Sequence, residues 1–440
     1  MSMMHEPKHR VAVVGAGPAG LFAARTLSQN GVRVALFNRD LKPGGLAEYG
    51  IYPTKHKMKD GLRAQFRQIL SDPLVSYYGN VLVGQEGDLR LSDLRALGFQ
   101  ALLITVGAQA TKWLGLPGED LQGVYHAKDI VYHYNHLPLF ADRSFVIGQR
   151  VAVIGVGNVM TDIAHYLISE LRVAEVIAIA RRGPAEVKFD KKELEHIIAN
   201  LDLPAFDAEI ERVADVMRSL GQDPQAARAF VHSVSGKALA CDSPTRLRIL
   251  FLESPERILG DEKGRVCGVM LRDNTLAREG DEVRAKPLDS FHTLEVDTVI
   301  FAIGDRVDPG LGLPVQNGEF IKKLTPRFPV EGLSYEVEAA FDGVFVAGWA
   351  RKSSAGLVGV ARKDGEQGAK AVLQYLADQP EQSAELDGVE AALQRLGKPI
   401  VRLPDLLRLD EAERVEAQRR GEEHFRFERN EEMLRVMGLA

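Results

Sequence analysis

The sequence predicts an α/β fold built from two units of the same design, followed by a helical C-terminal tail. Two stretches support this, VAVVGAGPAGLFAA near the start of the chain and VAVIGVGNVMTDIA further along. Each places an apolar strand before a glycine turn and a helix after it. This pattern is the fingerprint of a Rossmann-like dinucleotide-binding unit. A chain of 440 residues is also too long for one ordinary core, so two or three lobes are expected.

The first turn follows a short apolar strand at residues 11–14. Gly15 permits the tight turn, Gly17 lets a pyrophosphate approach the backbone, and Gly20 allows the helix to pack closely on the strand. The start of the helix then offers free N–H groups to an anion. A glycine turn without a ligand is the alternative, and the second strand at the expected distance argues against it.

The residue that ends the second strand of this unit is unusual. An acid normally stands there and accepts hydrogen bonds from the adenosine ribose. Here it is Asn38, and Arg39 follows it. A neutral amide beside a cation leaves two nucleotides open for the first turn, FAD and NADP.

The second turn contains Gly155 and Gly157, but its third glycine position is Met160, which implies a looser or shifted helix. The next strand ends at Arg181 and Arg182, where an acid would repel a 2′-phosphate. Guanidinium groups pair bidentately with phosphate oxygens, so NADP is favoured over NAD. The alternative is a solvated charge pair on a loop.

The composition is typical of a soluble globular enzyme, with 45% apolar and 26% charged residues. A formal net charge of −6 argues against nucleic-acid binding by bulk charge. Cys241 and Cys267 form no CxxC pair, which argues against a disulfide reductase or a cysteine-ligated metal. Because no signal peptide or membrane-spanning apolar run is evident, we expect a cytoplasmic protein with no membrane partner.

Three later segments combine an apolar strand with a glycine turn, namely residues 101–110, 297–309 and 343–350. Each is expected to leave its nucleotide unit near the cofactor, although any one of them alone also fits an ordinary core strand. After the third segment, Gly356 can let backbone N–H groups approach a ring carbonyl closely.

These stretches resemble the adrenodoxin reductase type of ferredoxin–NADP reductase and, more loosely, the small subunit of glutamate synthase. The resemblance is carried by the two turns and by GGLAEYGI, ARRGPAEVKFDKKELE and VAGWARKSSAGLVG, and it covers most of the chain. It implies an FAD domain in two pieces with an NADP domain inserted between them. The expected boundaries are 1–112 and 321–380 for the FAD domain, 113–320 for the NADP domain, and 381–440 for a linker and helical tail.

The resemblance also assigns cofactor-binding residues. The FAD site would use the first turn, the strand end, the GGL segment and the GW and AG segments: Gly15, Gly17, Pro18, Ala19, Gly20, Asn38, Arg39, Gly45, Leu46, Trp349, Gly356 and Leu357. The NADP site would use the second turn, the arginine pair and the KEL segment: Gly155, Gly157, Asn158, Val159, Arg181, Arg182 and Glu193. With the better phosphate ligands on the second turn, the first turn is assigned to FAD.

The implied reaction is hydride transfer from NADPH to FAD, followed by single-electron transfer to a ferredoxin-type iron–sulfur protein. Lys55, His56 and Glu193 are the candidates for the reaction centre. Lys55 can stabilise the anionic reduced flavin, and His56 can carry protons near neutral pH. The alternatives are a solvated lysine, a surface histidine and an acid that only begins a helix.

Three departures from the family bear on these roles. Asn38 replaces an acid, Lys55 replaces a histidine of the adrenodoxin reductase type, and His196 replaces a glutamate. The last two lie where nicotinamide meets flavin, so a proton-relay role does not transfer directly. We expect the Asn38 amide oxygen to accept from the ribose more weakly than a carboxylate, with Asp40 as the next candidate.

Residues 55–67 contain five Lys or Arg residues and one Asp, and Arg351, Lys352, Arg362 and Lys363 add positive charge. Complementary charge would steer an acidic ferredoxin to this surface, and a solvated helix face is the alternative. A synthase subunit, a flavodoxin or a quinone stays open as another acceptor. A nucleotide-binding sensor without turnover is a rival from another class, which the two intact turns argue against.

Overall fold

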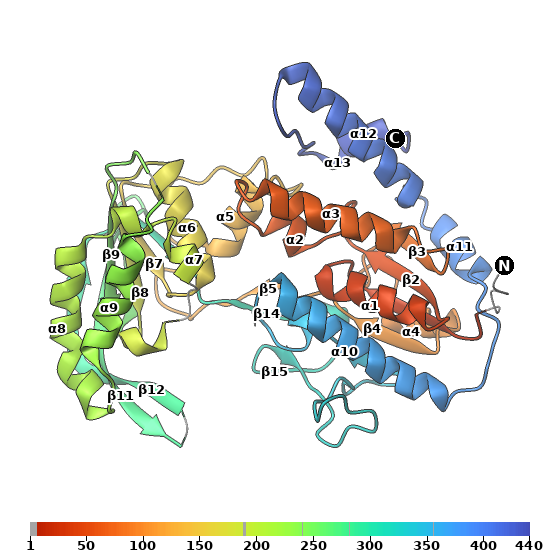
Figure 1. Ribbon diagram of the computed structural model, residues 1–440, viewed down its shortest axis with the longest axis horizontal. Helices are drawn as coiled ribbons and strands as arrows, with labels where there is room; N and C mark the ends of the chain where they lie inside the picture. Colours follow the sequence, from red (N-terminus) through yellow and green to blue (C-terminus); the bar gives the residue numbers. More distant parts are fainter. Residues whose placement is uncertain (1–6, 188–190, 240, 281, 355) are drawn as a thin grey trace. The chain divides into compact units, whose positions relative to one another are not determined.

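The computed structural model describes residues 7–187, 191–239, 241–280, 282–354 and 356–440 (Figure 1). It confirms an α/β fold with parallel sheets and C-terminal helices. None of the helices among these described residues combines the length and the apolar character that a bilayer crossing requires.

The chain divides into two compact units. The first contains the chain up to Thr111, together with Tyr132–Asp142 and Gly304–Ala440, and the second contains Lys112–Val131 and Arg143–Ile303. Residues 304–320, which the sequence assigned to the inserted domain, thus belong to the first unit. The reason is packing, because Val307, Leu311 and Phe320 are buried in a core of that unit.

A five-stranded parallel sheet with the order β17-β4-β1-β2-β3 forms the centre of the first unit. The strands are β1 (Arg10–Val14), β2 (Arg33–Asn38), β3 (Val75–Gly79), β4 (Ala101–Ile104) and β17 (Val344–Val346). Two short pairs accompany it, β5 (Ala110–Thr111) with β14 (Asp305–Arg306), and β15 (Val315–Gln316) with β16 (Glu319–Phe320). Because β1 lies between β2 and β4 in parallel register, the turns that follow these strands open at one edge of the sheet.

Both faces of this sheet are buried, since successive side chains of a strand point to opposite faces. Val11 and Val13 of β1 lie in one core, and Ala12 and Val14 lie in the other. The first core receives α1 (Pro18–Gln29), α3 (His56–Leu70) and α10 (Val358–Ala377), and the second receives α4 (Leu91–Ala96) and α11 (Asp387–Gln394). The short helix α2 (Leu46–Tyr49) precedes α3.

The C-terminal tail is a structural part of the first unit. It contains α12 (Leu403–Arg420) and α13 (Asn430–Met437), which lie side by side in Figure 1. Leu409, Met433 and Met437 are fully buried in the first core. A buried ion pair also joins α12 to the loop after β2, since Nζ of Lys42 lies 2.5 Å from Oε1 of Glu413.

The second unit repeats the parallel sheet, with the order β6-β13-β7-β8-β9. Its strands are β6 (Val124–His126), β7 (Arg150–Ile154), β8 (Glu175–Ala180), β9 (Arg246–Phe251) and β13 (Thr298–Phe301). Strand β7 lies between β8 and β13, as β1 lies between β2 and β4 in the first unit.

Helices and a second sheet complete this unit. The helices are α6 (Asn158–Ser169), α7 (Lys191–Leu194), α8 (Leu203–Ser219), α9 (Pro224–Ser235) and the part of α5 (Ala127–Tyr134) up to Val131. The antiparallel sheet consists of β10 (Glu253–Gly260), β11 (Val266–Glu279) and β12 (Glu282–Leu294). Val269 and Leu271 of β11 share a core with Ile177 of β8, so this sheet packs on the parallel one.

Candidate active site

The first glycine turn joins β1 to α1. Gly15 has φ +104°, and a Cβ there would lie 2.6 Å from the carbonyl oxygen of Thr105. A Cβ on Gly20 would lie only 2.0 Å from the carbonyl oxygen of Gly15. Both positions therefore admit only glycine, the first for its backbone angle and the second for the close contact of helix and turn.

The space beside Gly17 is open, with no atom of the described residues within 4 Å of a Cβ placed there. Gly17 begins α1, no side chain caps this helix, and Pro18 occupies its first turn. The N–H groups at the start of α1 are therefore available to an anion. Gly45 closes in from the GGL segment, since its Cβ would lie 3.2 Å from Cα of Gly17, and Leu46 follows it. This arrangement fits the pyrophosphate of FAD.

Asn38 braces this turn from the end of β2. The side chain is buried, and its oxygen accepts a hydrogen bond from the backbone N–H of Ala16 at 3.1 Å. The amide nitrogen donates to the carbonyl oxygens of Asp40 and Lys42, both at 2.9 Å. Asn38 thus ties the loop after β2 to the turn, a role that the sequence did not indicate. Its contact with a ribose stays a prediction.

Arg39 already has a carboxylate partner. Its Nε lies 3.2 Å from Oδ1 of Asp40, and the charge of Asp40 raises the pKa of Arg39. A paired guanidinium is a poorer ligand for a 2′-phosphate than an unpaired one. This geometry favours FAD over NADP on the first turn.

A partly buried aspartate that the sequence did not single out holds the GW segment. Asp364 of α10 accepts a hydrogen bond from the backbone N–H of Gly348 at 2.6 Å and from the hydroxyl of Tyr335 at 3.1 Å. It also accepts from Nε of Arg351 at 3.0 Å. Asp364 therefore fixes the 3₁₀ turn that carries Trp349. This role of Asp364 depends on a hydrogen bond to a residue 16 positions away in the chain, so no local sequence motif could have indicated it.

The 3₁₀ turn lies against the first glycine turn, and the residues before α10 pack on that helix itself. A Cβ on Gly348, which has φ +67°, would lie 2.6 Å from Cβ of Ala19. Gly356 has φ +75°, and its Cβ would lie 2.6 Å from Cβ of Val360. Leu357 follows it and is half-exposed at the first position before α10. Ala355 of the same segment lies outside the described residues.

The second glycine turn joins β7 to α6. Gly155 has φ +117°, and its Cβ would lie 2.4 Å from the carbonyl oxygen of Ala302. Gly157 begins α6 without a side-chain cap and has no atom within 4 Å of a Cβ placed there. This second open, uncapped helix start also fits a pyrophosphate. Met160 at the third position is fully buried.

Arg181 and Arg182 follow β8 directly. Arg181 is exposed and Arg182 is half-exposed. Within the part of the chain that the structure describes, neither guanidinium forms an ion pair, in contrast to Arg39. Two unpaired guanidinium groups at this strand end fit the 2′-phosphate of NADP.

The remaining NADP candidates lie on two helices of the second unit. Asn158 and Val159 form the first turn of α6, where the Val159 side chain is 38% exposed. Glu193 lies in α7, and His196, just beyond it, stacks on His165 of α6 with ring centroids 5.2 Å apart. These contacts bring the KEL segment and α6 together within the unit.

Lys55 and His56 begin α3 in the first unit. The imidazole of His56 stacks on that of His424 from the C-terminal tail, with ring centroids 4.1 Å apart. Burial and the charge of His424 both lower the pKa of His56. The sequence indicated neither this stacking nor a role of the tail beside His56. Glu193 belongs to the other unit, so a joint reaction centre of the three residues stays a prediction.

The sequence also did not indicate a buried charged cluster on α2 and α3. Arg63 donates to both carboxylate oxygens of Glu48, at 2.7 and 2.8 Å. Burial alone would raise the pKa of Glu48, but Arg63 outweighs it and lowers the pKa to about 2. One turn earlier on α3, Nζ of Lys59 donates to Oδ1 of Asn135 at 2.7 Å, and burial lowers the pKa of Lys59 to about 8. Lys59 and Arg63 are four residues apart and therefore lie on one face of α3. This spacing is the sequence signal that could have indicated the cluster.

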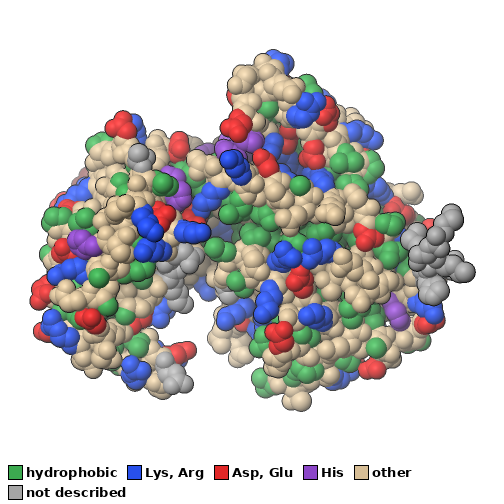
Figure 2. Space-filling view, in the orientation of Figure 1, with side chains coloured by type: hydrophobic (Ala, Val, Ile, Leu, Met, Phe, Trp, Pro, Cys, Tyr) green, Lys and Arg blue, Asp and Glu red, His purple; other side chains and the backbone are tan. Residues whose placement is uncertain are grey.

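These contacts weaken the interpretation of residues 55–67 as a positively charged docking segment. Lys59 is buried, Arg63 binds Glu48, and Arg67 donates to both oxygens of Asp410 at 2.6 and 2.8 Å. Figure 2 likewise shows acidic and basic side chains interspersed over the visible face. Three of the five basic side chains counted along the segment are therefore engaged within the fold, two of them with carboxylates.

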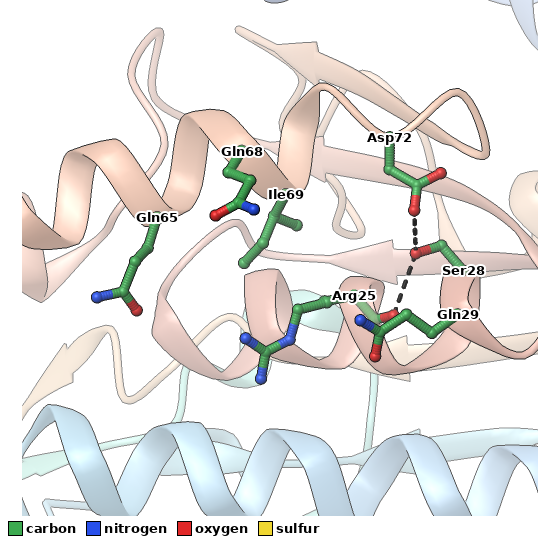
Figure 3. A pocket seen from close by; sticks show the side chains of 7 residues that line it. All are labelled: Arg25, Ser28, Gln29, Gln65, Gln68, Ile69 and Asp72. Carbon is green, nitrogen blue, oxygen red and sulfur yellow. Dashed lines mark hydrogen bonds between the residues drawn. The ribbon is translucent and has the colours of Figure 1, made fainter.

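A pocket of about 270 Å³ lies between α1 and α3, lined by Arg25, Ser28, Gln29, Gln65, Gln68, Ile69 and Asp72 (Figure 3). It lies at the last turn of α1, whereas the glycine turn is at the first. Arg25 binds Glu366 at 2.7 Å, and the hydroxyl of Ser28 donates to Asp72 at 2.8 Å. The pocket is separate from the nucleotide turn.

Comparison with known proteins agrees with this arrangement. Residues 9–205 match the pyridine nucleotide-disulphide oxidoreductase family. The chain is 30% identical to NADPH-ferredoxin reductase FprA of Mycobacterium leprae, covering 84% of each chain. It is 27% identical to the mitochondrial NADPH:adrenodoxin oxidoreductase of Salvelinus fontinalis, covering 97% of this chain and 91% of that one. The solved structure of Mycobacterium tuberculosis FprA in complex with NADPH superposes with a TM-score of 0.82 at 25% identity, covering 98% of this chain and 99% of that one.

Proposed function

Because the chain belongs to the adrenodoxin reductase-type family of ferredoxin–NADP reductases, we propose that it is an FAD-dependent NADPH oxidoreductase that serves a ferredoxin-type iron–sulfur protein. FAD, when bound, supplies the flavin that takes a hydride from NADPH and releases single electrons. The observation that carries the proposal is the pair of open, uncapped glycine turns; among the described residues, Arg39 after the first is paired and Arg181 and Arg182 after the second are not.

The chain's own residues bind and orient the two nucleotides. The start of α1 beside Gly17 holds the FAD pyrophosphate, and Asp364 holds the 3₁₀ turn with Trp349 in place. Arg181 and Arg182 pair with the 2′-phosphate of NADPH, which distinguishes it from NADH.

Lys55, His56 and Glu193 are proposed for the reaction centre. Lys55 supplies positive charge for the reduced cofactor, and His56 supplies a group that can take up a proton. We expect Lys55→Ala to slow flavin reduction by NADPH at least about tenfold in stopped-flow measurements while the FAD content is unchanged. Lys57→Ala, a change of the exposed lysine two residues on, is the control. An unchanged rate for Lys55→Ala would contradict the assignment.

The acceptor is proposed to be acidic, as ferredoxins are as a class, and to dock by complementary charge. With Lys59, Arg63 and Arg67 engaged internally, the charges proposed for docking are the exposed Lys57 and Lys352. Ferredoxin-dependent turnover should therefore fall as the salt concentration rises. Turnover that is independent of salt would count against a charged docking surface.

A direct test uses the purified protein, which should be yellow and should bleach anaerobically with NADPH. NADPH should act at far lower concentration than NADH. The reduced enzyme is then mixed with ferredoxins, a flavodoxin, quinones and cytochrome c to find its acceptor. Absence of bound flavin would exclude the proposal, and bleaching without reduction of any acceptor would favour a sensor. A cytoplasmic location is proposed with it and is tested by cell fractionation.

A further inference from the structure

The arginine pair after β8 is held from behind by residues much later in the chain. The carbonyl oxygen of Arg181 accepts a hydrogen bond from Nδ2 of Asn274 at 3.2 Å. The carbonyl oxygen of Arg182 accepts one from the backbone N–H of Leu252 at 3.3 Å. The backbone N–H of Asn274 donates in turn to the carbonyl oxygen of Leu252 at 2.7 Å. Both arginine backbones are thus part of one network with Leu252 and Asn274.

Asn274 reaches this position beside a bulge in the pairing of β11 with β12, whose extra residues lie on β12. Val269 and Leu271 are buried, so strict alternation would turn residue 273 inward next. The pairing of β11 with β12 shifts between Arg272 and Asn274, and the inward positions become Asn274 and Leu276. A bulge of this kind re-aims the side chains that follow it. Here it directs an amide, rather than a carboxylate, at the carbonyl oxygen of Arg181.

The Asn274 side chain is fixed in orientation. It is 5% exposed, and Nδ2 also donates to Oγ of Ser254 at 2.8 Å. Both amide hydrogens are therefore used, one on Ser254 and one on Arg181. A rotation of the amide would leave both acceptors unsatisfied, which is unfavourable in a buried place. The anchor of the arginine pair is consequently rigid.

Leu252 forms the second anchor. It lies between the end of β9 at Phe251 and the start of β10 at Glu253, with φ +56°. At this residue the N–H donates to the carbonyl oxygen of Arg182 and the carbonyl oxygen accepts from the N–H of Asn274. The parallel sheet that carries the arginines and the antiparallel sheet that extends from the unit in Figure 1 are joined at this point.

We propose that Asn274 is a positioning residue that determines the preference for NADPH over NADH. Bidentate pairing of a guanidinium with a phosphate requires that the backbone carrying the side chain has a defined position. Asn274 supplies it by holding the arginine backbone, while the guanidinium groups stay exposed and unpaired within the described residues. The inference rests on the proposed function, because it assumes that these arginines bind a 2′-phosphate.

The test compares Asn274→Ala with Asn200→Ala in the FAD-loaded enzyme. Asn200 is a matched control in the same unit, because its Nδ2 also donates to two partners, the carbonyl oxygens of Ser243 and Thr245, both at 2.9 Å. The probes are 2′,5′-ADP, which carries the 2′-phosphate, and 5′-AMP, which lacks it, with binding measured by calorimetry. Asn274→Ala should weaken 2′,5′-ADP about tenfold and leave 5′-AMP unchanged. The KM for NADPH should rise by a similar factor at nearly constant kcat. Asn200→Ala should change neither the ratio of the affinities for 2′,5′-ADP and 5′-AMP nor the ratio of KM to kcat.

Two results would overturn the inference: full discrimination between the probes in Asn274→Ala, or equal weakening of both. If the unchanged enzyme binds 2′,5′-ADP no better than 5′-AMP, the NADPH assignment itself is wrong, and this outcome is distinct from the other two. Asn274→Leu, which nearly keeps the side-chain volume, serves as a second variant should the alanine variant fold poorly. In an enzyme that carries Arg181→Ala and Arg182→Ala, the change at Asn274 should have no further effect on probe selectivity.

Discussion

The two glycine turns begin alike and diverge at the third position. Gly15 and Gly155 both have positive φ, and their N–H groups donate to Phe37 at 2.8 Å and to Ile179 at 2.9 Å at the equivalent place on the neighbouring strand. The first helix touches its own turn at Gly20, where no Cβ fits, whereas the second turn accommodates a buried Met160. A departure from the glycine motif therefore changes how the helix packs and leaves the open helix start intact.

The ends of the second strands differ more sharply. In the first unit Asn38 is buried and its amide nitrogen donates to carbonyl oxygens of the loop after β2, and Arg39 is paired with Asp40. In the second unit Arg181 is exposed, and among the described residues its backbone rather than its side chain is hydrogen-bonded. The two turns share an open helix start, and we expect the nucleotide that each one takes to depend on which groups of the strand end have no ion pair among the described residues.

The largest expected effect comes from Gly20→Ala, which tests the close contact in the first turn. The new Cβ would lie 2.0 Å from a backbone oxygen, so the helix or the turn must move. We expect a loss of more than about 3 kcal/mol in the free energy of unfolding, together with loss of bound FAD. Thermal unfolding and the flavin absorbance of the purified protein measure both.

Gly61→Ala is the matched control for that change. Gly61 lies in α3 with no atom within 4 Å of its Cβ position, so alanine there should stabilise the protein by about 0.5 kcal/mol and leave FAD bound. If Gly20→Ala retained FAD and stability as Gly61→Ala does, the contrast between the two turns would be wrong.

Removal of both guanidinium groups, by Arg181→Ala with Arg182→Ala, tests the second strand end. Loss of charge-assisted hydrogen bonds to the 2′-phosphate should cost about 3 kcal/mol of binding, which corresponds to a rise of the KM for NADPH on the order of 100-fold. The KM for NADH should stay within about twofold, since NADH makes no such contact. An equal rise of the KM for NADPH and of the KM for NADH would indicate that the arginines support the fold instead.

The units also differ in a buried carboxylate. The pKa of Glu48 is lowered from its ordinary value of 4.5 to about 2, so its contribution to stability is present above pH 4.5 and is lost as the pH falls toward 2. Burial raises the pKa of Glu253 to about 7, although the charge of Arg212 opposes it. That contribution is present below pH 4.5 and is lost as the pH rises through 7. Each shift corresponds to about 3 kcal/mol at most.

Glutamine variants should therefore act in opposite directions. Glu48→Gln should lower the unfolding free energy at about pH 7 by up to about 3 kcal/mol, and Glu253→Gln should raise it at about pH 8 by up to the same amount. At about pH 4 the gain from Glu253→Gln should disappear. Urea unfolding followed from acid to weakly alkaline pH measures this, and two variants with the same sign would contradict the assignment.

The sequence was sufficient for features that depend on neighbours along the chain. The glycine spacing identified both turns, and the arginine pair was correctly placed directly after a strand, while its role with NADP stays a prediction. It was insufficient where partners come from distant segments. Positive charge counted along residues 55–67 overlooked Asp410 of the tail, and nothing local marked Asp364 as the residue that holds Gly348.

Asn38→Asp gives the smallest expected effect, and it asks whether the first strand end can be made to resemble its acid-bearing relatives. The carboxylate keeps an acceptor for the N–H of Ala16 but cannot donate to the carbonyl oxygens of Asp40 and Lys42. We expect a loss of about 2 kcal/mol in unfolding free energy and no tighter binding of FAD. The sequence alone predicts the opposite, because an acid should improve a ribose contact. Titration of the apoprotein with FAD decides between them, and tighter binding without loss of stability would show that Asn38 acts on the ribose rather than on the loop.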